Sequence, residues 1–248
     1  MKKTLTLVSI ITLLSFCAKA QDSEPKDYVK SYLSLFGGFS YAKSDFGQST
    51  YENNKAGFAK RGATVGFDGA YYFYKNLGFG ATFSFQDQGE LTIPDVQVLA
   101  NGYNNALKVN STLVQSVGRY HNLALMGGPQ YSFTYGKFIL DLRASGGLLK
   151  SSSTPALTIY VSGATGTAQQ TINQLSSTAK AFAYGGDAAL RWQFADGWDL
   201  GLRLNYINSD GLKITTNGDT GALGNVGRLV TKQPITVLQT TLGIGVHF

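Results

Sequence analysis

Eight segments of this chain alternate strictly between apolar and polar residues, and each is ten to sixteen residues long. Alternation with a period of two gives a β-strand one apolar and one polar face. Strands of soluble proteins usually have about five or six residues, whereas a tilted membrane-spanning strand needs about 9–11. The pattern therefore predicts eight membrane-length strands. They cover residues 32–41, 63–74, 77–86, 120–135, 138–149, 181–194, 198–207 and 236–248.

Seven charged residues lie inside these segments, and all seven fall on the polar parity. A charge that faces lipid near the bilayer centre costs up to ~2–4 kcal/mol, so the apolar parity is predicted to face lipid. The interior of an eight-stranded barrel is just wide enough to be filled by side chains, and charges there should pair. We expect a lumen charge network made of Asp68, Asp141, Arg143, Asp187, Arg191, Asp199 and Arg203. Such a network acts either as a structural plug or as a gate in a narrow ion path.

The connections between the segments alternate strictly between short and long. The short ones are 75–76, 136–137 and 195–197, and the long ones are 42–62, 87–119, 150–180 and 208–235. This asymmetry is typical of short periplasmic turns and long extracellular loops, which places both chain ends on the periplasmic side. Aromatic residues gather near the short-turn ends, as membrane-interface residues do. The predicted aromatic girdle is Phe73, Tyr135, Phe138, Phe194, Trp198 and Phe248.

The first twenty residues have the features of a cleaved export signal. Lys2 and Lys3 precede an apolar stretch of about twelve residues, and Ala18-Lys19-Ala20 supplies a small-x-small cleavage pattern. We therefore expect a signal peptide at 1–20, a short periplasmic lead-in at 21–31 and an outer-membrane barrel at 32–248. Lipoprotein processing at Cys17 is the rival interpretation, and the bulky residue before that cysteine disfavours it.

Charge and cysteine content exclude several other classes of protein. The formal net charge is +6, and removal of three lysines with residues 1–20 leaves 18 minus 15, or +3. This modest excess, without a basic stripe, argues against a nucleic-acid partner. A single cysteine makes neither an internal disulfide nor a thiolate zinc site, so we expect no cofactor and no metal.

The last strand carries the most specific signal, Leu242-Gly-Ile244-Gly-Val246-His-Phe248. With the eight strands and the short–long alternation, it resembles the small outer-membrane β-barrels of Gram-negative bacteria, which include the OmpA transmembrane domain and the OmpW-like and opacity-protein-like barrels of the porin family. The resemblance is one of architecture and covers residues 32–248. It implies that the barrel-assembly machinery reads the last strand, with Leu242, Ile244, Val246 and Phe248 as the assembly signal.

The predicted fold is thus an all-β, eight-stranded antiparallel up-and-down transmembrane β-barrel in the outer membrane, monomeric and surrounded by outer-membrane lipid. Its expected role is structural or surface-interacting, with the lumen plugged and extracellular ligands meeting the long loops. The alternatives are a narrow porin-like barrel for small or apolar solutes and, more remotely, a lipid-modifying enzyme that uses His121. The loops at 87–119 and 150–180 are long enough for hairpins that extend beyond the membrane. If one such hairpin joined the barrel wall as an extra strand pair, the barrel would have ten strands.

Overall fold

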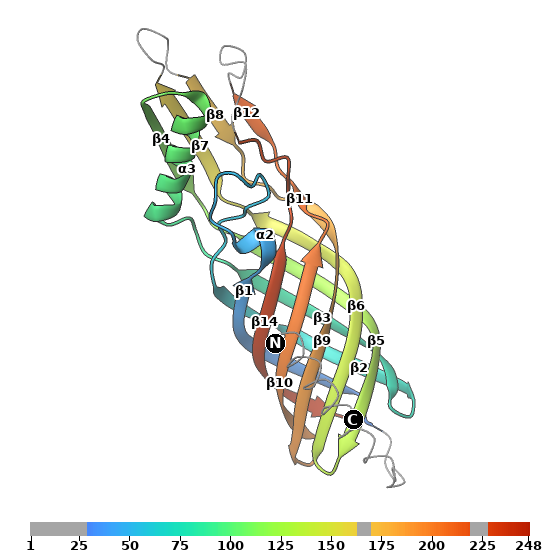
Figure 1. Ribbon diagram of the computed structural model, residues 1–248. Helices are drawn as coiled ribbons and strands as arrows, with labels where there is room; N and C mark the ends of the chain where they lie inside the picture. Colours follow the sequence, from blue (N-terminus) through green and yellow to red (C-terminus); the bar gives the residue numbers. More distant parts are fainter. Residues whose placement is uncertain (1–28, 163–169, 219–227) are drawn as a thin grey trace, which may run out of the picture.

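The computed structural model describes residues 29–162, 170–218 and 228–248 (Figure 1). The predicted signal peptide at 1–20 and all but the last three residues of the predicted lead-in at 21–31 lie outside these ranges.

Eight antiparallel strands close into a barrel in the order β1-β14-β10-β9-β6-β5-β3-β2. Wall strands that follow each other in sequence pair across the short turns and the long connections alike, and the first strand pairs with the last, so the wall has no open edge. The expectation of an eight-stranded up-and-down barrel is confirmed, and the ten-stranded alternative is wrong. The strands are β1 (Tyr32–Ala42), β2 (Gly62–Tyr74), β3 (Leu77–Asp87), β5 (His121–Tyr135), β6 (Phe138–Ser153), β9 (Lys180–Ala195), β10 (Trp198–Ser209) and β14 (Thr236–His247).

The two parities of each strand face opposite sides of the wall. On β2, Phe67 is 53% exposed on the outer face, whereas the next residue, Asp68, is 1% exposed inside. The three short turns contain residues with positive φ, Lys75 (46°), Gly136 (57°) and Gly197 (75°), and hairpins of this length require such a backbone. The last strand ends beside them, since the His247 amide donates to the Gly197 carbonyl (2.9 Å).

The long connections fold into a second layer beyond the barrel mouth, visible at the upper end of Figure 1. A four-stranded sheet in the order β12-β8-β7-β4 packs against one helix, with a small two-stranded sheet, β11-β13, beside it. We call this assembly, together with residues 48–61 and 228–231, the loop domain. Its elements are α3 (Ile93–Leu107), β4 (Ser111–Val117), β7 (Ala156–Ser162), β8 (Gln170–Gln174), β11 (Leu212–Lys213), β12 (Thr216–Gly218) and β13 (Lys232–Gln233). The hairpin expected within 150–180 therefore forms, but it leaves the barrel wall.

Helix α3 begins where local sequence favours a helix start. Thr92 and Asp95 form a reciprocal capping box, and Pro94 lies in the first turn, where its missing amide hydrogen is not needed. The buried face of α3 contributes Leu99 and Tyr103 to a core shared with the sheet. No helix in the described ranges is long and apolar enough to cross a bilayer.

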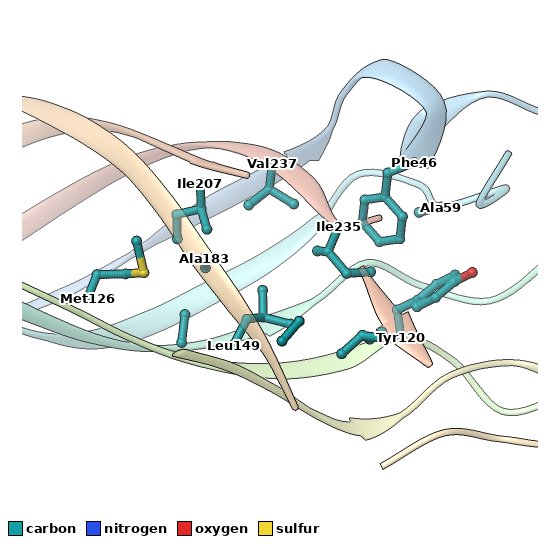
Figure 2. Close-up of a cluster of buried hydrophobic side chains, with 12 residues drawn as sticks. Phe46, Ala59, Tyr120, Met126, Leu149, Ala183, Ile207, Ile235 and Val237 are labelled. Atoms are coloured by element: carbon teal, nitrogen blue, oxygen red, sulfur yellow. The ribbon is translucent and has the colours of Figure 1, made fainter. Parts of the chain in front are cut away.

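An apolar core seals the barrel at its long-loop end (Figure 2). A short helix after β1, α2 (Ser44–Gly47), places Phe46 over the mouth, where its ring meets Tyr120 edge-on at a centroid distance of 4.9 Å. Below them, inward-facing apolar side chains fill the lumen. Buried members of this core are Phe46, Ala59, Tyr120, Ala124, Met126, Leu149, Ala181, Ala183, Ile207, Leu212, Ile235 and Val237. The inward charges are therefore confined toward the short-turn end, and near the loops the inward parity carries apolar side chains together with uncharged polar ones such as Gln86 and Asn122, a distinction that the sequence pattern missed.

Candidate functional site

Asp68 on β2 is the centre of the first of two charge clusters in the lumen. Its carboxylate accepts hydrogen bonds from the Tyr32 hydroxyl (2.7 Å), the Thr82 hydroxyl (2.5 Å) and Arg143 NH1 (2.9 Å). Arg203 also donates to it from the opposite side of the barrel. These partners come from four different strands, so the carboxylate ties the wall together across its interior.

The same two guanidinium groups also face Asp187 on β9. Arg203 NH1 donates to Asp187 Oδ1 at 2.5 Å, and Arg143 Nε lies 3.7 Å from Asp187 Oδ2. Arg143 completes its hydrogen bonding with the side-chain oxygen of Gln130, to which NH2 donates at 2.6 Å. Two carboxylates and two guanidiniums thus balance within this cluster, as buried charge requires.

The second cluster surrounds Arg191, nearer the short-turn end. Its Nε donates to Asp141 Oδ2 (2.6 Å) and its NH1 to Asp199 Oδ2 (3.0 Å). Asp141 also accepts from the Ser132 hydroxyl at 2.5 Å, and Tyr72 lies within hydrogen-bond distance of Ser132 at 2.6 Å. Both oxygens of the buried Asp141 carboxylate therefore accept from donors on the neighbouring strands, Arg191 on β9 and Ser132 on β5.

Two tyrosines join the clusters. The Arg191 guanidinium lies 3.8 Å above the ring of Tyr32, whose hydroxyl belongs to the first cluster. Gln130 donates to the Tyr72 hydroxyl (2.5 Å) while it accepts from Arg143, which links the clusters a second time. The structure thus brings all seven charged residues named from the sequence into one network. Tyr32 and Tyr72 were missed, although both lie on the inward parity that their polar neighbours mark.

The second cluster has one carboxylate more than it has guanidiniums. His247 lies beside the extra carboxylate, with Nδ1 3.8 Å from Asp199 Oδ2. This nitrogen is buried and has no hydrogen-bond partner among the described residues.

Glycine creates the space that the network occupies. A Cβ atom built on Gly80 would lie 2.4 Å from the Arg143 Cζ, and one on Gly66 would lie 2.8 Å from the Phe36 Cζ. The Arg143 side chain is fixed by its hydrogen bonds and has little freedom to move away. These inward glycines therefore make room for large neighbours, and at these positions they do not line a ligand channel.

Little free volume remains beside the network. A cavity of about 20 Å³ lies between the Arg191–Asp199 pair and Phe36 on β1, along the inner face of β1, β14, β10 and β9. A cavity of this size holds about one water molecule. The arrangement can therefore rigidify the wall and exclude solutes, and the described residues contain no group of three or more His, Cys, Asp or Glu side chains that could hold a metal ion.

The predicted girdle and assembly residues lie on the outer surface. All six aromatic residues are exposed and lie at the short-turn ends of β2, β5, β6, β9, β10 and β14. On β14, Leu242, Ile244 and Val246 face outward, and the Phe248 amide donates to the Ser31 carbonyl (2.9 Å). The apolar surface needed for a membrane belt is thus continuous to the end of the described chain.

Arg228 holds the loop domain together from within. Its guanidinium donates to the Ala56 carbonyl and lies 5.2 Å from the Phe58 ring centroid. Its backbone carbonyl accepts from the Tyr103 hydroxyl (3.0 Å), and its amide donates to the Tyr51 hydroxyl (2.9 Å). Burial lowers the pKa of the guanidinium and raises the pKa of Tyr103 to about 12. This residue therefore connects segments that are far apart in sequence.

Asp95 ties the start of α3 to the segment that leads into β2. It accepts from Lys60 Nζ at 2.7 Å and from the Thr92 amide at 2.8 Å. Burial alone would raise the pKa of Asp95, but these hydrogen bonds outweigh burial and hold the pKa below its ordinary value. A carboxylate with a lowered pKa stabilises the fold above its unfolded pKa of about 3.9, and this contribution is lost as pH falls through the folded pKa.

Asp95→Asn should therefore lower the free energy of local opening of α3 by about 1–2 kcal/mol at pH 7, because a charge-assisted hydrogen bond is lost. Amide hydrogen exchange of α3, corrected for intrinsic exchange, measures this change. In the wild type, protection of α3 should fall as pH drops below about 4, and in the variant that fall should be smaller. Glu90→Gln, which alters an exposed carboxylate, serves as the control. Equal protection in all three proteins would contradict the assignment.

The similarity of this chain to known proteins is limited to the fold. No family model matches the chain, and no curated protein matches it in sequence. Among solved structures, it is similar to Neisserial surface protein A (12% identity, 88% of this chain and 97% of that chain covered, TM-score 0.41). It is also similar to Ail, the attachment invasion locus protein of Yersinia pestis (14%, 90% and 100%, TM-score 0.41), and to a major outer membrane protein from Thermus thermophilus (12%, 89% and 99%, TM-score 0.43).

The closed eight-stranded wall, its apolar outer face and its filled interior define the class of this protein. It is a small β-barrel of the outer-membrane type, with short periplasmic turns at one end and long extracellular connections at the other. The eight-stranded barrel expected from the alternation of the sequence is thus confirmed, with its apolar parity on the outer face.

Proposed function

We propose that this barrel is a plugged outer-membrane protein with a structural or surface-interaction role, and that its loop domain is the part that meets extracellular ligands. The observation that carries the proposal is the double closure of the lumen. A network of paired charges fills the half near the short turns, and an apolar core together with buried uncharged side chains such as Gln86 and Gln239 fills the half near the loops. A barrel closed twice presents its surface to the outside and passes no solute.

Conductance in planar bilayers tests this proposal against the porin-like alternative. We expect no discrete channel steps from the wild type. Arg143→Ala should also give none, because the apolar core around Phe46 still closes the mouth. Bilayers that receive protein-free micelles provide the blank. A channel in the wild type whose conductance changes in Arg143→Ala would replace the plug with a gated ion path.

The loop domain is the second support for a surface role. It has its own buried core, formed by α3 and the four-stranded sheet, and this core keeps the sheet rigid beyond the membrane. The outward face of the sheet contains Leu113 and Val117, which are 56% and 73% exposed. Exposed apolar side chains on a rigid scaffold are typical of interaction surfaces.

The geometry around His121 supports a non-enzymatic protein. His121 Nε2 lies 3.7 Å from Asp87 Oδ2, but the Ser153 hydroxyl, opposite His121 in the β5–β6 register, donates to the Arg119 carbonyl at 2.7 Å. A serine nucleophile must instead hydrogen-bond to its general base. We therefore propose that His121 is a structural residue of the rim and that the barrel does not modify lipids.

The closed wall and the last strand support two further proposals about partners. The β1–β14 pairing leaves no free strand edge in the barrel, so the barrel folds as a monomer. The exposed apolar face of β14, ending at Phe248, is the part offered to the barrel-assembly machinery.

A further inference from the structure

The outer face of the barrel changes from apolar to charged at one level of β6 and β9. Leu148 and Phe182 are opposite each other in the β6–β9 register and are 55% and 53% exposed. One outward-facing position closer to the loops, Lys150 and Lys180 are directly opposite each other, and both are exposed. The next outward position on β6 is Ser152, which is also exposed. The two lysines therefore lie at the upper boundary of the lipid-facing surface.

Two like charges directly opposite each other on an antiparallel pair destabilise the sheet unless another group compensates them. In the described ranges, the lysine that forms an ion pair is Lys60, with Asp95. Asp210 follows the end of the neighbouring strand β10, and its amide donates to the Phe182 carbonyl (3.0 Å). The Asp210 carboxylate forms no ion pair with either lysine. No acidic residue in the described part of the chain thus compensates Lys150 and Lys180 by an ion pair.

We propose that Lys150 and Lys180 bind the phosphate group of an anionic lipid in the outer leaflet. The two ammonium groups would hold the phosphate at headgroup level, and the acyl chains would lie along Leu148 and Phe182 directly below. Lysines near a membrane surface attract anionic lipid, and each strengthens binding about fivefold. Because the β6–β9 register places the two lysines directly opposite each other, this general attraction is concentrated at one site on the barrel. The proposal rests on the membrane placement of the barrel and is independent of a role for the loop domain.

Native mass spectrometry of the barrel tests the site. The protein is released from mixed micelles that contain equal amounts of phosphatidylglycerol and phosphatidylcholine. We expect the wild type to retain phosphatidylglycerol preferentially. Lys150→Gln with Lys180→Gln should reduce this retention by about fivefold for each lysine replaced. Lys150→Arg with Lys180→Arg should preserve it, which also shows that an altered pair still folds.

The chain offers a matched control in the loop domain. Lys213 and Lys232 are also opposite each other, in the β11–β13 register, and both are exposed. Lys213→Gln with Lys232→Gln removes the same charge away from the lipid-facing surface and should leave retention unchanged. An equal loss in this control, no loss in the Lys150 and Lys180 variant, or full displacement of the lipid by millimolar inorganic phosphate would overturn the proposal. Heat-modifiable mobility, measured in parallel, reports barrel formation separately.

Discussion

Arg143→Met should lower the free energy of unfolding by about 3–5 kcal/mol, because it leaves two buried carboxylates, Asp68 and Asp187, to share the single guanidinium of Arg203. Arg143 donates to Asp68 and Gln130 and faces Asp187, and its side chain is fully buried. Methionine has a similar length and keeps much of the apolar packing, so the loss reports the charge. Urea titration of the barrel in lipid vesicles, followed by tryptophan fluorescence, measures the change.

Two further variants separate this network from a general effect of arginine. Arg119→Met removes a half-exposed arginine that pairs with Asp87, and we expect a change of at most about 1 kcal/mol. Arg143→Met combined with Asp187→Asn restores the charge balance of the first cluster and should recover part of the lost stability. If Arg143→Met and Arg119→Met lowered stability equally, the lumen network would not stabilise the barrel.

Phe46→Ala should cost about 3–5 kcal/mol and loosen the closure of the barrel mouth, because it opens a cavity in a fully buried core. Phe46 is 0% exposed and packs against Tyr120 and against the start of β14. Limited proteolysis within 43–61 measures the loosening, and urea unfolding measures the free energy. We expect cleavage in the variant under conditions in which the wild type is resistant.

Size and location control this second prediction. Phe46→Leu keeps most of the buried volume and should cost less than about 1.5 kcal/mol. Phe133→Ala removes the same ring from the lipid-facing surface of β5, so it should leave the cleavage pattern at 43–61 unchanged. Cleavage that was equal in Phe46→Ala and Phe133→Ala would show that the mouth is not closed by Phe46.

Arg143 and Phe46 show how much of the burial of a side chain the local sequence pattern predicts. Arg143 was expected in the lumen because its parity on an alternating segment decides its face. Phe46 lies in a long connection with no alternation, so nothing in its neighbours predicts its burial. The same holds for Arg228, which is buried only because residues 48–61 and α3 surround it. Periodicity reports a face only where the chain runs as a regular strand.

The interior also shows where parity is informative but incomplete. Leu149, Ile207 and Val237 face inward like the charged residues, yet they belong to an apolar core. The wall continues beyond the level of Lys150, and Phe46 with Tyr120 covers it there. Whether an inward position is polar or apolar therefore depends on where it lies along the barrel axis and on which side chains cover it there. The alternation of the sequence carries no information about position along the axis.

The sequence by itself determined the strands, their inward and outward faces, the alternation of turns and loops, and the identity of the seven lumen charges. These features follow from a period of two and from the exclusion of charge by lipid, and both act residue by residue. Only the tertiary structure decided which arginine meets which aspartate, that Tyr32 and Tyr72 join the two clusters, and that the long connections build a domain. Such contacts depend on strand register and on packing between segments more than a hundred residues apart, as with Tyr103 and Arg228.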